Sequence, residues 1–88
     1  MKKIIVKGIV QGVGFRYFTV NQANRCGIKG CVKNLNNGDV EIVVSNPEIA
    51  GYRDFVEAVR KGPFSAKVDK VVILEYEGRD YLQFSVER

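Results

Sequence analysis

A chain of 88 residues is long enough for one hydrophobic core and too short for two, so we expect residues 1–88 to form a single domain. Apolar residues make up 45% of the chain and charged residues 27%, which is typical of folded globular proteins and excludes a disordered tail. The net charge of +4 favours an anionic partner, without choosing between a small phosphate ester, a nucleic acid and an acidic protein.

The first predicted element is a β-strand over residues 2–10. Its side chains alternate between one face with Ile4, Val6, Gly8 and Val10 and a wetter face with Lys3, Ile5, Lys7 and Ile9. Lys7 interrupts the apolar run too early for a secretory signal, and no stretch approaches the ~20 apolar residues of a membrane span. We therefore expect a cytoplasmic protein without a membrane partner.

A glycine-rich loop follows this strand, because residues 8–16 read GIVQGVGFR. Gly12 and Gly14 let a ligand approach the backbone, and a helix N-terminus after the loop supplies unpaired N–H groups and a positive dipole end. Arg16 adds a planar fork of donors that suits phosphate or carboxylate. We predict a phosphate-binding loop made by the backbone of Gln11, Gly12, Val13, Gly14, Phe15 and Arg16.

A helix is predicted over residues 15–26, and Gly27 is expected to end it. Its apolar stripe is predicted to contain Phe15, Phe18, Gln22 and Cys26. Tyr17 and Phe18 are interpreted as core aromatics rather than as platforms on which bases stack.

Two cysteines, Cys26 and Cys31, stand close together in the sequence. An extended chain would hold their Cα atoms roughly 16 Å apart, so a disulfide requires a chain reversal, which Gly27 and Gly30 would permit. We favour the alternative of two small half-buried thiols in a reducing compartment. Two cysteines without any histidine do not make a common zinc site, so no metal is expected.

The rest of the chain predicts a hairpin, a helix and two further strands. Residues 29–35 and 39–45 are expected to pair through a tight turn at Asn36, Asn37 and Gly38, with Val40, Ile42 and Val44 inward. Asn46 is expected to cap a helix that begins at Pro47 and ends before Gly62 and Pro63. Its apolar face carries Ile49, Tyr52, Phe55, Val56 and Val59. Residues 68–76 predict a long strand, residues 77–80 a polar turn, and Leu82, Phe84 and Val86 a short last strand.

This order of elements predicts an α+β protein with the ferredoxin-like, split βαβ fold: a βαββαβ sandwich with a short C-terminal strand. A mainly antiparallel sheet is then covered by two helices on one face. A helical crossover makes the first two strands parallel, so their C-terminal ends lie at the same end of the sheet. Arg16 follows the first strand and Asn34 lies near the end of the second, so we expect both to face one pocket.

The residue types at this pocket limit the chemistry. The chain has no histidine, which excludes the histidine-based triads and the commonest general base. Backbone amides, Arg16 and the Asn34 carboxamide bind a phosphoryl group but supply little acid or base. Hydrolysis of an acyl phosphate needs little acid catalysis, because its leaving group is a carboxylate whose acid has a pKa near ~4. We expect Arg16 and the loop to hold the phosphate, Asn34 to orient the attacking water, and the substrate phosphate to accept its proton.

Two segments resemble the signatures of the acylphosphatase family: GIVQGVGFR at 8–16 and GCVKNLNNGDVEI at 30–42. With the element order and the Phe-Ser-Val ending at 84–86, the resemblance covers essentially the whole chain. It implies that Arg16 is the phosphate-binding arginine and Asn34 the catalytic asparagine. It also implies the ferredoxin-like fold, no cofactor, and hydrolysis of small-molecule acyl phosphates to a carboxylate and phosphate, without a nucleic-acid partner. We expect a monomer.

The chain departs from that family's pattern at two positions. Cys31 stands where an aromatic residue is usual, and Asn46 stands where the second signature usually ends in glycine. We interpret both departures as changes of packing or turn geometry.

Other functions are compatible with the same topology. A non-catalytic ferredoxin-like module that binds an anion or a nucleic acid is the main alternative. An RNA-recognition domain would carry aromatic residues on its third central strand, whereas residues 39–45 contain none. A further alternative is the acylphosphatase-like module of hydrogenase-maturation carbamoyltransferases, which is followed by zinc fingers and further domains that this chain does not contain.

Overall fold

The strands and helices follow one another in the predicted order. The computed structural model describes residues 1–87, which form five strands and two helices. Their bounds are β1 (Lys2–Ile9), α1 (Phe15–Cys26), β2 (Gly30–Asn34), β3 (Val40–Val44), α2 (Gly51–Lys61), β4 (Lys67–Glu75) and β5 (Phe84–Val86). Helix α1 has the predicted bounds, and the strand limits differ from the predicted ones by one or two residues.

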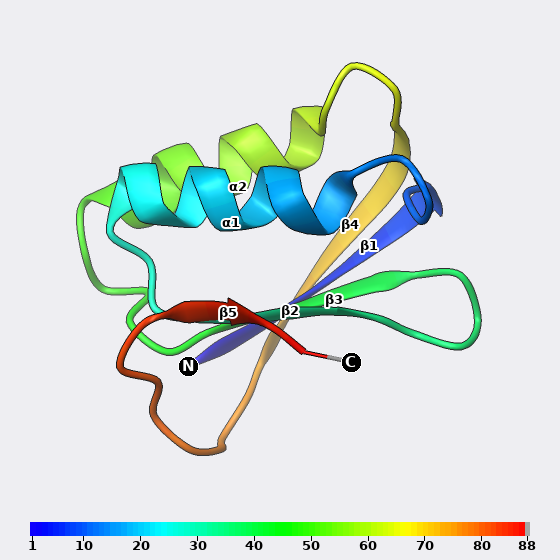
Figure 1. Cartoon of the computed structure of the whole chain (residues 1–88). Coiled ribbons are helices and arrows are strands. Elements are labelled where there is room, and N and C mark those ends of the chain that lie inside the picture. Colours follow the sequence, from blue (N-terminus) through cyan, green and yellow to red (C-terminus); the bar gives the residue numbers. More distant parts are fainter. Residues whose placement is uncertain (88) are drawn as a thin grey trace.

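The strands form one sheet in the spatial order β4-β1-β3-β2-β5. Strand β3 pairs antiparallel with both β1 and β2, so β1 and β2 run in the same direction; β5 pairs parallel with β2. Both helices cover the same face of the sheet (Figure 1). This arrangement confirms the predicted split βαβ sandwich. Neither α1 nor α2 is long and apolar enough to cross a membrane.

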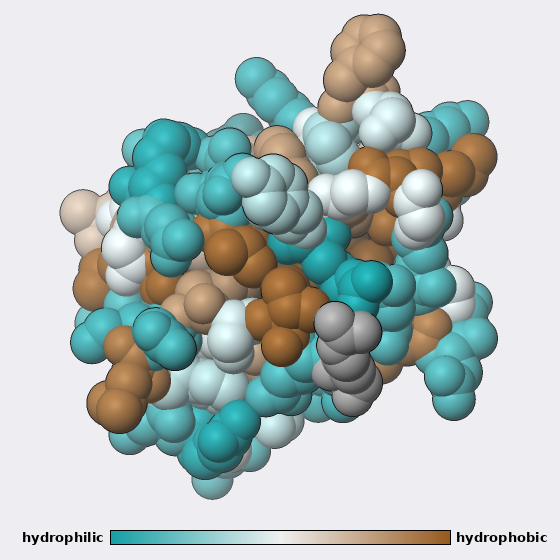
Figure 2. All heavy atoms as spheres, in the orientation of Figure 1, coloured by the Kyte–Doolittle hydropathy of each residue, from teal (hydrophilic) through white to brown (hydrophobic). Residues whose placement is uncertain are grey.

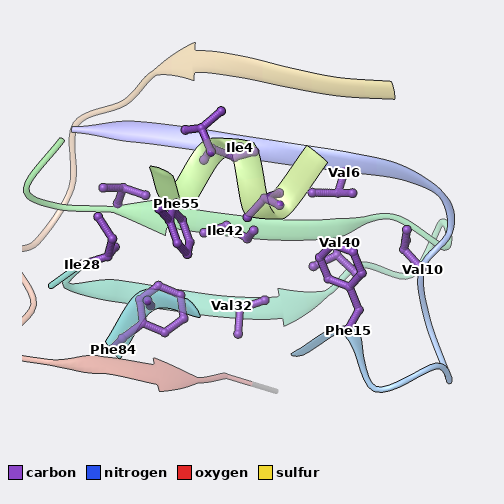
Figure 3. Close-up of a cluster of buried hydrophobic side chains, with 14 residues drawn as sticks. Ile4, Val6, Val10, Phe15, Ile28, Val32, Val40, Ile42, Phe55 and Phe84 are labelled. Atoms are coloured by element: carbon purple, nitrogen blue, oxygen red, sulfur yellow. The ribbon is translucent and has the colours of Figure 1, made fainter. Parts of the chain in front are cut away.

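The core lies between the helices and the face of the sheet that they cover. The predicted alternation is confirmed for Ile4, Val6, Val40, Ile42 and Val44, whose side chains no solvent reaches. It fails at the end of β1, where the register with β4 shifts between Lys7 and Gly8 and Gly8 is exposed. Phe15 from α1 lies at the same end of the core as Val10 and Val40 (Figure 3). Phe55 and Phe84 meet edge to face elsewhere in the core, with ring centres 6.1 Å apart. Phe15 therefore anchors the first turn of α1 to the sheet, directly after the glycine-rich loop.

The buried side of α1 differs from the predicted stripe. Its buried residues are Phe15, Thr19 and Ala23. Thr19 is accommodated in the core because its hydroxyl donates a hydrogen bond to the Phe15 carbonyl at 2.8 Å. Cys26 is half-buried and packs against the core, as predicted, whereas Phe18 and Gln22 are half-buried and do not belong to the buried stripe.

Tyr17 is not a core residue, contrary to the prediction. Its side chain is 74% exposed, because it lies outside the helical row that carries Phe15 and Thr19 into the core. Phe18 is half-buried and packs beside Phe15, with ring centres 5.9 Å apart. Neither aromatic residue belongs to the core, although the Phe18 ring contacts the buried ring of Phe15.

Helix α2 begins later than predicted, at Gly51 rather than at Pro47, and Asn46 does not cap it. The Asn46 side chain is engaged elsewhere. Its Oδ1 accepts a hydrogen bond from the Lys29 N–H at 2.9 Å, and its Nδ2 donates to the Gly27 carbonyl at 3.0 Å. Asn46 therefore fastens the connection between α1 and β2 to the end of β3. The predicted apolar face of α2 is confirmed by the burial of Phe55, Val56 and Val59.

The predicted hairpin between β2 and β3 is confirmed, and its loop contains residues 36–38. The Leu35 N–H donates to the Asp39 carbonyl at 2.9 Å, and the Gly38 N–H donates to the Leu35 carbonyl at 3.2 Å. The Asp39 carboxylate also pairs with Lys7 of β1 at 2.7 Å. The base of the hairpin is thus held both by its own backbone and by the neighbouring strand.

Residues 76–83 connect β4 to β5 across the sheet face that the helices leave open, and we call this segment the strap (Figure 1). The Lys3 ammonium lies 4.2 Å from the centre of the Tyr76 ring. The Cys31 thiol donates a hydrogen bond to the Tyr81 hydroxyl at 3.3 Å. The strap therefore contacts two strands of the sheet and covers Cys31, which is 3% exposed.

The structure also decides two sequence predictions, one for Leu82 and one for the two cysteines. Leu82 lies in the strap and is 94% exposed, so its predicted place in the last strand was wrong. Cys26 and Cys31 are both free thiols, which confirms the preferred alternative to a disulfide; Cys26 is half-buried as predicted, whereas Cys31 is buried. Burial raises the pKa of the Cys31 thiol above its ordinary value.

Candidate active site

The glycine-rich loop turns the chain from β1 into α1 (Figure 1). Gly12 and Gly14 have φ angles of +73° and +78°, left-handed values that residues with side chains rarely adopt. A Cβ atom at either position would meet nothing within 4 Å. The glycines therefore set the shape of the turn and leave open space beside its backbone.

Helix α1 begins at this loop without a side-chain cap. The Phe18 N–H donates to the Gly14 carbonyl at 3.0 Å, so the N–H groups of Phe15, Arg16 and Tyr17 precede the first α-helical donor. The first turn of α1 contains no acidic residue. These donors and the positive end of the helix dipole favour an anion at this point of the fold.

Arg16 and Asn34 line one pocket, as the parallel course of β1 and β2 predicts. This pocket, which we call the phosphate pocket after the phosphate-binding loop predicted beside it, has a volume of about 170 Å³ and is also lined by Val10, Gly12, Gly14, Phe15 and Tyr17. Arg16 is half-buried, and within residues 1–87 it makes no salt bridge. Its positive charge is therefore suited to an anionic ligand.

Two of the predicted loop residues do not line the phosphate pocket but hold the loop in place. The Gln11 side-chain Nε2 donates to the carbonyls of Leu35 and Asp39, both at 2.7 Å. The Ser65 hydroxyl donates to the Val13 carbonyl at 2.9 Å. The loop is thereby fixed to the β2–β3 hairpin on one side and to the α2–β4 connection on the other. Phosphate binding by the backbone of Gln11 and Val13 stays a prediction.

Asn34 is the last residue of β2 and pairs with Val40 of β3. Its Oδ1 is buried, and among residues 1–87 it has no hydrogen-bond partner. A buried acceptor without a donor costs about 1–3 kcal/mol. A water molecule or ligand that donated a hydrogen bond to the Asn34 carboxamide would remove this cost.

The phosphate pocket offers hydrogen-bond donors, one guanidinium and one carboxamide. Its described lining contains no carboxylate, thiol or imidazole. Across residues 1–87, no three His, Cys, Asp or Glu side chains gather as metal ligands. The arrangement suits the binding of an anion and the stabilisation of developing negative charge.

Two residues line the pocket without having been predicted for it: Val10, which was expected only on the core face of its strand, and Tyr17. Tyr17 lines the phosphate pocket and is largely exposed, whereas its aromatic character indicated the core. The available signal was its place in the first turn of a helix, directly after Arg16, where side chains border the unpaired N–H groups.

Gln11→Ala is expected to lower the free energy of unfolding by about 1–2 kcal/mol, because the part-buried carbonyls of Leu35 and Asp39 each lose one hydrogen bond and keep only a backbone donor. Urea denaturation measures this change. Gln83→Ala is the matched control, since that exposed side chain makes no hydrogen bond within residues 1–87, and it is expected to stay within about 0.5 kcal/mol of the wild type. Equal stability of the two variants would show that the Gln11 tether contributes nothing.

Comparison with known proteins places these features in a family context. A family model described as Acylphosphatase matches residues 2–86. A protein of Caldivirga maquilingensis named Acylphosphatase is 48% identical over 86 residues, which cover 96% of this chain and 90% of that protein. One of Actinobacillus succinogenes with the same name is 42% identical over 90 residues, which cover 99% and 97%. The crystal structure of acylphosphatase from Bacillus subtilis aligns with a TM-score of 0.90 at 39% identity, over 99% of this chain and 97% of that one.

Proposed function

Because the chain belongs to the acylphosphatase family, we propose that it hydrolyses the carboxyl–phosphate bond of acyl phosphates to a carboxylate and inorganic phosphate. The observation that supports this most strongly is the one pocket that gathers Arg16, the loop at Gly12 and Gly14, and Asn34. Among phosphoryl compounds, an acyl phosphate suits such a pocket because its leaving group departs as a carboxylate and needs no acid.

In this mechanism, Arg16 and the loop amides hold the phosphoryl group. The guanidinium forms two parallel N–H···O bonds to two of the phosphoryl oxygens. Backbone N–H groups from Gln11 to Arg16 contact the remaining oxygens, as at other helix N-termini that bind phosphate. Together these donors stabilise the negative charge that the phosphoryl oxygens carry in the transition state.

Asn34 positions the attacking water. Its unpaired Oδ1 supports this role, because accepting one O–H of the water fixes the direction of the water's lone pair. The water oxygen forms a bond to phosphorus as the bond from phosphorus to the acyl oxygen breaks. The electron pair of that bond leaves with the carboxylate, and the proton of the water passes to a phosphate oxygen. No side chain has to act as a base.

The test follows hydrolysis of benzoyl phosphate in the ultraviolet without added metal. Wild-type protein is expected to turn the substrate over. Asn34→Ala is expected to lower kcat about 100-fold or more with little change in KM, because Arg16 still binds the phosphate. Asn36→Ala, which removes an exposed asparagine from the hairpin loop, is the matched control and is expected to keep the wild-type rate. Circular dichroism checks that all three proteins are folded.

The experiment tests two parts of the proposal independently: hydrolysis by the protein, and the role of Asn34 in it. No turnover by folded wild-type protein would contradict hydrolysis and favour a non-catalytic module that binds an anion or a nucleic acid. A phosphate titration of the loop would then follow. Equal rates for Asn34→Ala and the wild type would contradict the role of Asn34 alone.

A further inference from the structure

A second pocket lies beside the phosphate pocket, between helix α1 and strand β5. It has a volume of about 340 Å³ and is lined by Arg16, Tyr17, Val20 and Val86; we call it the α1–β5 pocket. Its size is at the lower end of the range for small-ligand sites, roughly 300–1,000 Å³. Hydrophobic side chains gather on this face of the molecule, between α1 and β5 (Figure 2).

The side chains of the α1–β5 pocket are more exposed than the fold requires. Tyr17 is 74% exposed and Val86 is 42% exposed, while Val20 is half-buried. Tyr17 and Val20 are three residues apart and therefore neighbours on α1; Val20 packs partly against the core, and the Tyr17 side chain beside it is left exposed. Apolar groups that remain exposed beside a polar site are typical of surfaces that contact a ligand.

Arg16 and Tyr17 line both pockets, so the two pockets are adjacent and share these side chains as a border. A group attached to a phosphoryl bound in the phosphate pocket reaches the α1–β5 pocket past the Arg16 side chain. We propose that the α1–β5 pocket receives the acyl group of the substrate, an inference that rests on the proposed function. Tyr17, Val20 and Val86 then determine which acyl phosphates are hydrolysed fastest.

The lining indicates an uncharged, apolar acyl group. Among the described residues, Arg16 is the one charged side chain there, and its guanidinium is engaged by the phosphoryl group. The Tyr17 ring offers a flat face to an aromatic acyl group, and the methyl groups of the two valines contact its edge or an aliphatic branch. A remote carboxylate on the acyl group would lose hydration without gaining a partner. The favoured substrates are therefore acyl phosphates with aromatic or branched aliphatic acyl groups.

The experiment measures kcat/KM for benzoyl, acetyl and succinyl phosphate in wild type, Val86→Ala and Val86→Lys. Val86 is suitable because it lies at the exposed end of β5 and outside the phosphate pocket. We expect Val86→Ala to lower the benzoyl-to-acetyl ratio of kcat/KM about threefold, and Val86→Lys to lower it about tenfold. We expect Val86→Lys to raise the succinyl-to-acetyl ratio about fivefold, because its ammonium pairs with the distal carboxylate.

Leu82→Ala and Leu82→Lys are the matched controls, because Leu82 is 94% exposed in the strap and lines neither pocket. Leu82→Lys adds the same charge and is expected to leave both substrate ratios unchanged. Unchanged ratios in the two Val86 variants, or equal changes in the Leu82 variants, would overturn the acyl-group assignment while wild-type hydrolysis upholds the proposed function. A folded wild-type protein that hydrolyses none of the three substrates would overturn both.

Discussion

Replacement of Arg16 by lysine is expected to lower kcat/KM for benzoyl phosphate about a thousandfold while the fold is kept. A lysine ammonium retains the charge but cannot make two parallel hydrogen bonds to neighbouring phosphoryl oxygens. The lysine side chain then no longer matches the arrangement of the phosphoryl oxygens in the transition state, although its positive charge still attracts phosphate. Lysine and arginine have similar helix propensities, and Arg16 makes no salt bridge within residues 1–87, so stability should change little.

The matched control for this substitution is Arg25→Lys. Arg25 lies on the same helix, is exposed, and donates a hydrogen bond from its Nε to the Gln22 side chain at 2.9 Å. Its replacement is expected to leave kcat/KM unchanged. The inhibition constant for inorganic phosphate should rise in Arg16→Lys and stay constant in Arg25→Lys. Turnover of Arg16→Lys within tenfold of the wild type would show that charge alone suffices, contrary to the proposed bidentate contact.

Gly30→Ala is expected to destabilise the domain by about 4 kcal/mol or more, which would leave much of the protein unfolded. Gly30 begins β2 with a φ of +153°, and a Cβ there would lie 1.7 Å from the carbonyl oxygen of Val43. The obstacle is backbone in the neighbouring strand, so it cannot move aside as a flexible side chain would. Relief requires β2 to separate from β3 at the point where Gly30 also pairs with Phe84 of β5.

Gly38→Ala separates the effect of contact from the effect of dihedral angle. Gly38 has a φ of +97°, but a Cβ there would meet nothing within 4 Å. Its replacement should therefore cost only the conformational strain, about 1–2 kcal/mol. The midpoints of urea denaturation compare the two variants. A midpoint for Gly30→Ala at or above that of Gly38→Ala would mean that the strands yield easily, and the packing argument would fail.

The sequence was sufficient for the features that depend on short-range patterns. The alternation of Val40, Ile42 and Val44 predicted which side of β3 enters the core, and Gly27 predicted where α1 ends. The parallel course of β1 and β2 followed from the element order, and it predicted that Arg16 and Asn34 share a pocket. These features need no knowledge of which distant residues meet.

The features that the sequence did not predict depend on contacts between distant residues. Asn46 is of a residue type that commonly caps helices. Its side chain instead forms hydrogen bonds with Gly27 and Lys29, which are 19 and 17 residues away. Thr19 is polar, and only its hydrogen bond to Phe15 makes it compatible with the core. This placement turns α1 so that Tyr17, chemically similar to a core aromatic, faces solvent beside the phosphate pocket.

The strap makes the Cys31 thiol a reporter of local opening. Because the thiol is 3% exposed and hydrogen-bonded to Tyr81, a thiol-specific reagent reaches it only in molecules whose strap has lifted from the sheet. Cys26, half-buried at the end of α1, lies outside the strap and serves as the internal reference. The labelling rate of Cys31 divided by that of an unprotected cysteine then gives the equilibrium constant for opening, and a value larger than the constant for global unfolding identifies local opening of the strap. Opening of the strap over the helix-free face of the sheet is in this way accessible to kinetic measurement through the protein's own side chains.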